Sequence, residues 1–322
     1  MSRTYKATGI NLKSMPMGES DRLLTILTRE FGLVRAIAMG SRKHNSRMGG
    51  RSELFVVNEL MFAKGRSLDK ITQAETLESY PRLGQDLRKL IASQYLAELC
   101  LHQALSEQPQ EELFYLFNEH LARLERSPAS QVLAHLTHAV FQLLVLAGVA
   151  PQVHLCCMTR AALPPDLTDC NWRVGFSIPA GGTVTLAVLE QLLLKPAPRR
   201  HQVAEAAAVR VPQVGEPHAM SDTTAVTSRP VKVYQPSQAI ASLHRRLSAP
   251  ELMLMQHLAE ATLPEPEALL AQMQMAGESY GTLDPLWQSV EHVLRSYAQY
   301  YLDRPIRSAS LIDACFATAN PA

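Results

Sequence analysis

The chain has 322 residues, of which 47% are hydrophobic and 19% charged, a composition typical of folded globular proteins and a length sufficient for two domains. Its longest apolar segment, residues 139–150, is shorter than the roughly 18 residues that a membrane helix needs, and no early run resembles a signal peptide. Five cysteines at irregular spacings exclude a disulfide framework. We therefore expect a soluble, cytoplasmic protein without a membrane partner.

Positive charge is concentrated near the N-terminus. The formal net charge of the chain is +1, but residues 1–80 contain 13 Lys and Arg against 8 Asp and Glu, a net charge of +5. Residues 81–150 and residues 151–322 carry −2 each. This asymmetry favours a polyanionic partner for the first quarter of the chain.

The first 80 residues have the pattern of a small β domain. Five short segments rich in β-branched and large apolar residues are separated by glycine-bearing turns. They are YKATGINLKS (5–14), RLLTILT (22–28), LVRAIAM (33–39), LFVVNELMF (54–62) and LDKITQAE (68–75). A chain this short cannot build a full sandwich, so we expect a five-stranded barrel, and the OB-fold is the common nucleic-acid-binding form of such a barrel.

Helical periodicity replaces the strand pattern after Pro81. Three apolar stripes predict three helices, and we expect Ser127 and Pro128 to open the third. The stripes are Leu87, Leu90, Ile91, Tyr95 and Leu99; then Leu113, Phe117, Leu121 and Leu124; then Val132, Leu136, Val140, Leu143, Leu144 and Ala147. The fold class is therefore α+β and multi-domain, with an OB-fold domain at 1–80 and a helical domain at 81–322.

Two segments interrupt the helical domain. Residues 151–194 are irregular, with a possible strand pair around GFSI and TVTL, and residues 195–236 lack periodicity and indicate a flexible insert. Helices resume at Ser248, which forms a capping-box pattern with Glu251. A final stripe runs through Leu286, Trp287, Val290, Val293, Leu294, Tyr297 and Tyr301.

The segment FGLVRAIAMGSRKHNSRMGGRS (31–52) is the strongest candidate for a binding site. It contains five cations and no acid, and its second half is rich in glycine and serine, which predicts a loop between two strands. The cations are Arg35, Arg42, Lys43, Arg47 and Arg51. Such a loop can present guanidinium and ammonium groups to phosphates. On charge alone, a solvated loop without a ligand explains the same pattern.

Four segments together resemble the RecO family of bacterial recombination mediators. They are GESDR (18–22), LTREFGLVRAIAMGSRKHNSR (27–47), LFVVNELMFAKGRSLDKITQAE (54–75) and VLRSYAQYYLDRPIRS (293–308). The N-terminal part follows the order G-E-x-D-R, T-x-x-x-G and G-[AS]-R-[KR]-x-x-S, which is more specific than a charge cluster. The resemblance covers roughly residues 1–190 and 240–312.

The resemblance implies an N-terminal OB-fold followed by a helical domain, and a protein that binds single- and double-stranded DNA and anneals complementary strands. It also implies two direct protein partners, RecR and the C-terminal tail of single-stranded-DNA-binding protein, and RecA as an indirect partner. Arg42, Lys43 and Arg47 fall where the family carries basic loop residues. Further DNA-contacting candidates on the barrel are Arg22, Lys64, Arg66 and Lys70, and Arg22 could equally brace the barrel. We place the site for the tail within residues 81–150, near Arg82, Arg88, Arg123 and Arg126.

The cysteines depart from the family pattern. Many members carry two C-x-x-C pairs suited to tetrahedral zinc. Here Cys156 fits the first position, but the other three fall on Thr159, Thr185 and Val188. His154, Cys157 and Cys170 have poor ligand spacing for an improvised site. We therefore expect a degenerate, zinc-site-like subdomain at about 151–194 without a metal or another cofactor.

No pattern indicates an enzyme. His135 and His138 are three residues apart on an apolar helix without a carboxylate, and no phosphate-binding loop, dinucleotide fingerprint or nucleophile elbow is present. We expect a DNA-binding mediator without a catalytic step. An OB-fold RNA-binding or adaptor protein is the main alternative, and a hydrolase that uses the histidines and cysteines is a third.

Overall fold

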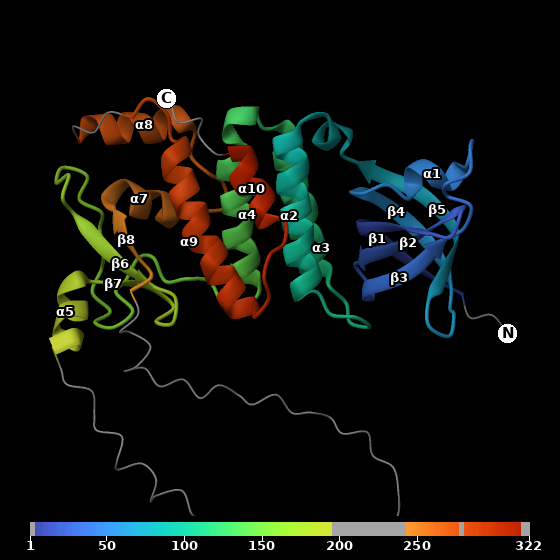
Figure 1. The fold of residues 1–322 in the computed structure, drawn as a ribbon, viewed down its shortest axis with the longest axis horizontal. Coiled ribbons are helices and arrows are strands. Elements are labelled where there is room, and N and C mark those ends of the chain that lie inside the picture. The colour runs from blue at the N-terminus through green and yellow to red at the C-terminus, as the bar shows by residue number, and fades with distance from the viewer. Residues whose placement is uncertain (1–3, 195–242, 277–279, 317–322) are drawn as a thin grey trace, which may run out of the picture.

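A computed structural model describes residues 4–194, 243–276 and 280–316 (Figure 1). A β-barrel lies at one end of the molecule, a helical region in the middle and a small sheet at the other end (Figure 1). The α+β class is therefore confirmed. The insert predicted at 195–236 lies outside the described residues.

The N-terminal barrel is closed, with strand order β1-β2-β3-β5-β4. All neighbouring strands are antiparallel except β3 and β5, which pair in parallel, and a short helix, α1, connects β3 to β4. This order and this helix position are those of the OB-fold, so the predicted barrel is confirmed. The elements are β1 (Thr4–Met17), β2 (Asp21–Thr28), β3 (Gly32–Ala38), α1 (Arg47–Arg51), β4 (Val56–Ala63) and β5 (Asp69–Ser79).

Side chains along the barrel strands alternate between the inner and outer faces, so they contribute to two different cores. Inward side chains, among them Ala7, Ile26 and Phe62, form a small core inside the barrel. Outward side chains of β1, β2 and β4 instead join the core of the helical region, and these are Ile10, Leu12, Leu27 and Val57. Successive residues of a strand face opposite sides, so one barrel wall is buried on both faces.

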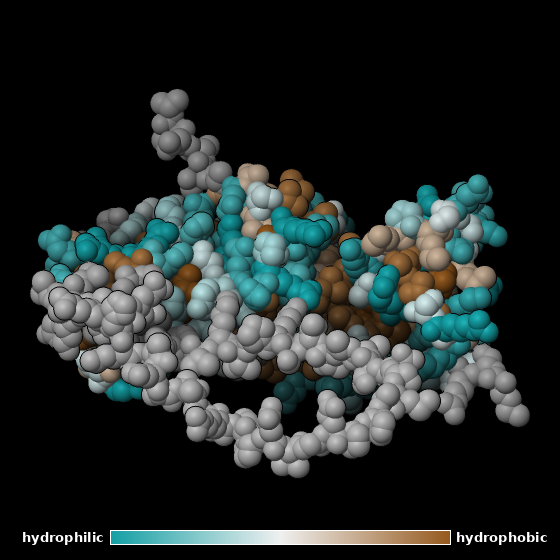
Figure 2. Space-filling view, turned by 60° about the horizontal axis from the view of Figure 1, so that its bottom comes forward, coloured by the Kyte–Doolittle hydropathy of each residue, from teal (hydrophilic) through white to brown (hydrophobic). Residues whose placement is uncertain are grey.

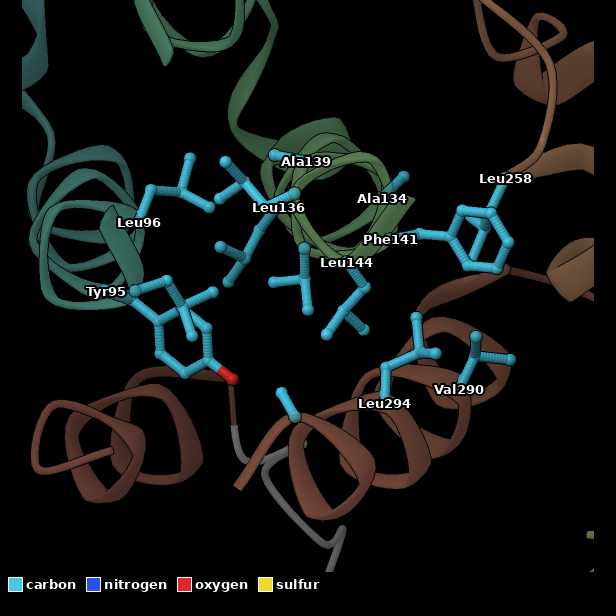
Figure 3. Close-up of a cluster of buried hydrophobic side chains, with 14 of the residues drawn as sticks. Tyr95, Leu96, Ala134, Leu136, Ala139, Phe141, Leu144, Leu258, Val290 and Leu294 are labelled. Atoms are coloured by element: carbon cyan, nitrogen blue, oxygen red, sulfur yellow. The ribbon is translucent and has the colours of Figure 1, made fainter. Parts of the chain in front are cut away.

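The helical region is built around α4. Tyr95 and Leu96 of α2 and Val290 and Leu294 of α9 converge on side chains of α4 such as Leu144 (Figure 3). The elements are η1 (Pro81–Gln85), α2 (Leu87–Gln103), α3 (Glu111–Arg126), η2 (Ala129–Gln131), α4 (Val132–Leu146), α7 (Ala249–His257), α8 (Pro266–Met275), α9 (Asp284–Leu302) and α10 (Ala309–Phe316).

The candidate membrane segment is a core helix. Residues 129–146 are long and apolar enough to cross a membrane by length and composition alone, although the sequence suggested no such segment. Most of this segment is buried inside the fold, and a core helix of a soluble protein passes the same test. Its apolar character is therefore explained by its packing against α2, α3 and α9.

Three details of the predicted helices are wrong. Leu87 begins α2 but is 66% exposed, so it does not belong to the buried stripe. Ala147 of the third stripe is likewise exposed and lies at the C-cap of α4, after its last residue. The Ser127 hydroxyl donates to the Leu124 carbonyl oxygen at the end of α3, and it therefore closes that helix instead of opening the next one. By contrast, the capping box between Ser248 and Glu251 is present at the start of α7.

Residues 151–194 are more regular than predicted. The suggested strand pair forms as β6 (Arg173–Ser177) and β7 (Gly182–Val184), and α5 (Leu186–Leu194) follows. A third strand, β8 (Arg245–Ser248), pairs with β6 from beyond the insert. Because β8 is remote in sequence and only four residues long, no local pattern identifies it.

The β2–β3 turn joins the barrel to the helical region. The Leu33 N–H donates to the Leu105 carbonyl oxygen at 2.9 Å, and the Gln110 N–H donates to the Arg29 carbonyl oxygen at 2.9 Å. Gly32 has a φ of +64° here, and a Cβ atom on it would lie 2.0 Å from the Leu105 oxygen. Only glycine fits this contact between the turn and the α2–α3 loop.

The junction predicts a large difference between two glycine substitutions. Gly18→Ala places alanine at a φ of +60° with no atom within 4 Å of its Cβ, so it should cost about 1–2 kcal/mol of backbone strain. Gly32→Ala adds a clash with backbone atoms and should lower the free energy of unfolding by clearly more. Denaturant unfolding of both variants measures the difference, and equal destabilisation would contradict the proposed tight fit.

Candidate nucleic-acid interface

The outer surfaces of β3 and β5, where Arg35 and Lys70 are exposed, form an open side of the barrel, since the helical region covers part of the outer surfaces of β1, β2 and β4. A groove of about 710 Å³ lies there, between the β2–β3 turn, the β4–β5 turn and the α2–α3 loop. We call it the barrel groove, and its lining includes Tyr5, Phe31, Arg35, Lys64, Arg66 and Ser106. OB-folds bind oligonucleotides on the face of strands 2 and 3 and the neighbouring loops.

The barrel groove brings together three of the predicted cations. Arg35 projects from the exposed side of β3, while Lys64 and Arg66 come from the β4–β5 turn. Lys70 follows on β5 in register with Ile37 of β3. Within the described parts of the chain, none of these four side chains forms a salt bridge, so their charges are available to a ligand.

Two acids also line the barrel groove. Asp69 is already engaged, because its carboxylate accepts hydrogen bonds from the Tyr5 hydroxyl and, at 3.0 Å, from the Gly65 N–H. Burial and the contact with Asp69 raise the pKa of Tyr5, so its phenol remains a donor. Glu107 is exposed on the α2–α3 loop. The groove therefore has an excess of positive charge.

A second basic group lies on the β3–β4 connection, residues 39–55, and includes Arg42, Lys43 and Arg47. All three are exposed and form no salt bridge within the described residues. The connection is anchored to the β1–β2 turn: the Arg42 guanidinium donates to the Gly18 carbonyl oxygen, and the Gly40 N–H donates to Asp21. The Gly40 N–H lowers the pKa of the Asp21 carboxyl, which keeps this acceptor ionised.

The second half of residues 31–52 joins two strands as predicted, but it is not a loop throughout, because Arg47 and Arg51 belong to α1. The Ser46 hydroxyl caps this helix by accepting from the Met48 N–H, and the side-chain amides of Asn11 and Asn58 donate to the Arg51 carbonyl oxygen at 2.8 and 2.9 Å. These tertiary contacts hold a five-residue helix that contains two glycines, which local propensity disfavours.

Arg22 braces the barrel. Its guanidinium contacts the carboxylate of Glu53 at 2.6 Å and the hydroxyl of Ser52 at 2.9 Å. Arg51 lines a separate hollow whose walls also carry Glu59 and Glu75. Arg22 is therefore engaged in an ion pair, whereas Arg51 lines the same hollow as Arg47, which belongs to the same helix.

Hydrophobic and hydrophilic side chains are intermixed on the face of the molecule that Figure 2 shows. Figure 2 shows hydrophobic surface both on the barrel, at the right, and on the helical region beside it, with hydrophilic residues around each area. Phe31 is 38% exposed at the barrel groove, and sequence analysis named it only as part of the basic segment. The sequence feature that could have identified Phe31 is its position in a glycine-bearing turn, because a large apolar side chain in an exposed turn does not contribute to a core.

In the predicted zinc-site-like subdomain, the Cys156 sulfur lies 4.0 Å from the Thr185 hydroxyl oxygen. Burial alone would raise the pKa of this thiol, but hydrogen bonds from Thr159, Thr185 and Met158 bring it down to about 7. The chain thus folds Thr159 and Thr185 against Cys156, as the spacing predicted, while Cys170 is exposed.

The histidines of the helical region are packed side chains. His138 is buried, and its imidazole lies 5.4 Å from that of His120, in edge-to-face contact. Burial lowers the pKa of His135 to about 4 and that of His120 to about 3, so both are neutral near pH 7. In the parts of the chain that the structure covers, no group of three or more His, Cys, Asp or Glu side chains could hold a metal ion.

Comparisons with known proteins agree with this architecture. Residues 1–80 match the family described as "Recombination protein O N terminal", and residues 84–197 match "Recombination protein O C terminal". The chain belongs to the RecO family. It is 53% identical over 325 residues to a "DNA repair protein RecO" of Nostoc punctiforme, covering 100% of this chain and 99% of that protein.

More distant relatives carry the same description. A "DNA repair protein RecO" of Cyanothece sp. is 51% identical over 322 residues, which cover 100% of this chain and 99% of the relative. One of Gloeobacter violaceus is 39% identical over 314 residues, which cover 98% of this chain and 94% of the relative. Membership of the RecO family gives the chain a role in DNA repair and recombination, and DNA binding in general.

The zinc site of many RecO family members does not fit these residues. Of the four positions that correspond to the ligands, only Cys156 offers a thiolate; Thr159 and Thr185 offer hydroxyls, and Val188 offers no donor. Structural zinc in proteins takes four well-placed nitrogen or sulfur ligands. The residues at these four positions are therefore a donor set that does not fit structural zinc.

We predict that the purified protein binds no stoichiometric zinc and that a chelator leaves its melting temperature unchanged. A variant with Thr159→Cys, Thr185→Cys and Val188→Cys is the matched control, because it restores four thiolates and should acquire zinc. Elemental analysis of both proteins decides the question. One zinc per chain in the unaltered protein would contradict the prediction.

The β3–β4 connection yields a prediction about salt dependence. If Arg42, Lys43 and Arg47 contact phosphates, replacing all three by alanine should weaken DNA binding similarly for all sequences. The logarithmic salt slope for single strands should become shallower by roughly 0.7 per lost contact, or about 2 in total. Stability should change little, since exposed side chains contribute within about 0.5 kcal/mol each.

A charge-matched control uses three exposed arginines outside the barrel, Arg160, Arg246 and Arg304. Their replacement by alanine should leave the salt slope unchanged. Fluorescent oligonucleotides titrated at several salt concentrations provide the slopes. Equal slopes for the folded barrel variant and the unaltered protein would remove the β3–β4 connection from the DNA site.

Proposed function

We propose that this RecO family protein is a recombination mediator that acts in the cytoplasm without a chemical step. It binds single- and double-stranded DNA through the barrel, anneals complementary strands and helps to load RecA onto strands coated by single-stranded-DNA-binding protein. RecR and the C-terminal tail of that protein are its protein partners. The observation that carries the proposal is the set of unpaired cations on the open side of an OB-fold.

The DNA contacts are divided between two places on the barrel. Arg35, Lys64, Arg66 and Lys70 surround or adjoin the barrel groove, and Arg42, Lys43 and Arg47 extend from the β3–β4 connection. Because these cations form no salt bridge within the described residues, they can neutralise phosphates without losing an existing ion pair. Arg22 acts mainly by holding the end of α1 against the barrel, so it contributes less to binding itself. Arg51 lies beside Arg47 and adds to the contacts of the β3–β4 connection.

In this proposal, residues 1–80 form the DNA-binding domain. Residues 81–322 form the helical domain, which binds the protein partners. An acidic tail that ends in apolar residues requires apolar surface beside cations. Leu87 and Arg88 are exposed at the start of α2, and the Arg88 guanidinium lies 5.5 Å from the ring centre of Phe316. Arg123 is a weaker candidate, because it is bonded to Glu119 and to the Ala261 carbonyl oxygen.

Annealing without ATP tests the function. The protein should accelerate annealing of complementary oligonucleotides, and the variant with Arg35, Lys64 and Arg66 replaced by alanine should lose on the order of tenfold or more of this activity, because phosphate neutralisation is lost. Strands coated by single-stranded-DNA-binding protein should be annealed only when that protein retains its tail. DNA binding without any annealing would instead favour an OB-fold adaptor.

A further inference from the structure

We propose that Phe31 is a stacking platform for an unpaired base, which gives the barrel groove a preference for single-stranded over double-stranded DNA. This inference rests on the proposed function, since it assumes that the groove receives DNA. It begins from the position of Phe31 on the β2–β3 turn, where the side chain is 38% exposed in the groove lining.

The ring of Phe31 is held from one side. Its centre lies 4.9 Å from that of Tyr5, at an interplanar angle of 69°, and Tyr5 in turn stacks on the buried ring of Phe62 at 5.0 Å. The Tyr5 hydroxyl is bonded to Asp69, which fixes the Tyr5 ring. A single edge-to-face contact covers at most one face of the Phe31 ring. The row of three rings therefore ends in an aromatic side chain that is open to solvent.

The backbone of Phe31 is also fixed. The Phe31 N–H donates to the Thr28 hydroxyl, and the following residues, Gly32 and Leu33, are seated on the Leu105 carbonyl oxygen. A residue on the other side, Arg29, donates from its guanidinium to the Tyr115 hydroxyl of α3. Because both flanks of the turn are bonded to the helical region, the ring can accept a base without first ordering a loop.

The charges around Phe31 suit a nucleic-acid strand. Arg35, Lys64 and Arg66 line the same groove and can contact phosphates while a base lies on the ring. Base stacking on aromatic side chains beside a basic groove is how proteins hold single strands without reading their sequence. In a duplex the base faces are already stacked on one another, so Phe31 can add affinity only for single strands.

The test compares Phe31→Ala and Phe31→Trp in the full-length protein with Leu77→Ala, which removes an exposed apolar side chain of β5 outside the groove lining. Phe31→Ala should weaken binding of an oligothymidine single strand by between about 5- and 150-fold, the range expected for loss of one base–aromatic stack. Phe31→Trp should retain the affinity, and Leu77→Ala should not change it.

Three readouts separate stacking from a structural role. The affinity for a duplex of the same length and the salt slope should stay unchanged in Phe31→Ala, because no phosphate contact is lost. The same substitution should have no effect on a single strand with abasic sites. A 2-aminopurine base in the single strand should be quenched by the unaltered protein and by Phe31→Trp, but not by Phe31→Ala.

Equal losses for single strands and duplex in Phe31→Ala would overturn the inference, as would unchanged single-strand affinity. Different results would contradict the proposed function. The barrel groove is not the DNA site if the unaltered protein binds neither form of DNA. The same conclusion follows if replacing Arg35, Lys64 and Arg66 by alanine leaves DNA binding intact. If that triple variant loses binding while Phe31→Ala does not, the function stands and the stacking role is wrong.

Discussion

The burial of one barrel wall against the helical region is the interaction on which the rest of the structure depends. Ile10, Leu12, Leu27 and Val57 face away from the barrel's own core and enter the larger helical core. Burial of apolar surface stabilises the folded state by about 25 cal/mol per Å². The same contact determines which outer surfaces of the barrel remain exposed to solvent. The outward side chains of β3 and β5, such as Arg35 and Lys70, remain exposed.

The same contact gives the open side its shape. The α2–α3 loop reaches the β2–β3 turn, where Gly32 admits the Leu105 carbonyl oxygen, and Ser106 of this loop lines the barrel groove. Cations from β3 and the β4–β5 turn then meet an aromatic side chain that the helical region helps to fix. The proposed DNA-binding surface is therefore a product of both regions, although the barrel supplies the charges.

Much of this architecture could be predicted from the sequence, because period-2 and period-3.6 patterns reflect burial directly. The five strands and the long helices are of this kind. Helix α1 could not be predicted in this way, since two of its five residues are glycines and Asn11 and Asn58 stabilise it from distant strands. Strand β8 was missed because its partner, β6, lies before the insert. The basic segment was found from charge, but the structure divides it: Arg35 joins Lys64 and Arg66, while Arg42, Lys43 and Arg47 lie elsewhere.

Hydrogen exchange of the full-length protein with and without a single-stranded oligonucleotide tests the central claim most directly, because it locates the DNA without any substitution. The structure predicts that DNA slows exchange in residues 31–37 and 64–70, which border the barrel groove, and in the β3–β4 connection. The far sheet, formed by β6, β7 and β8, should exchange as before. Protection confined to the helical region or to that sheet, with the barrel unchanged, would contradict the account.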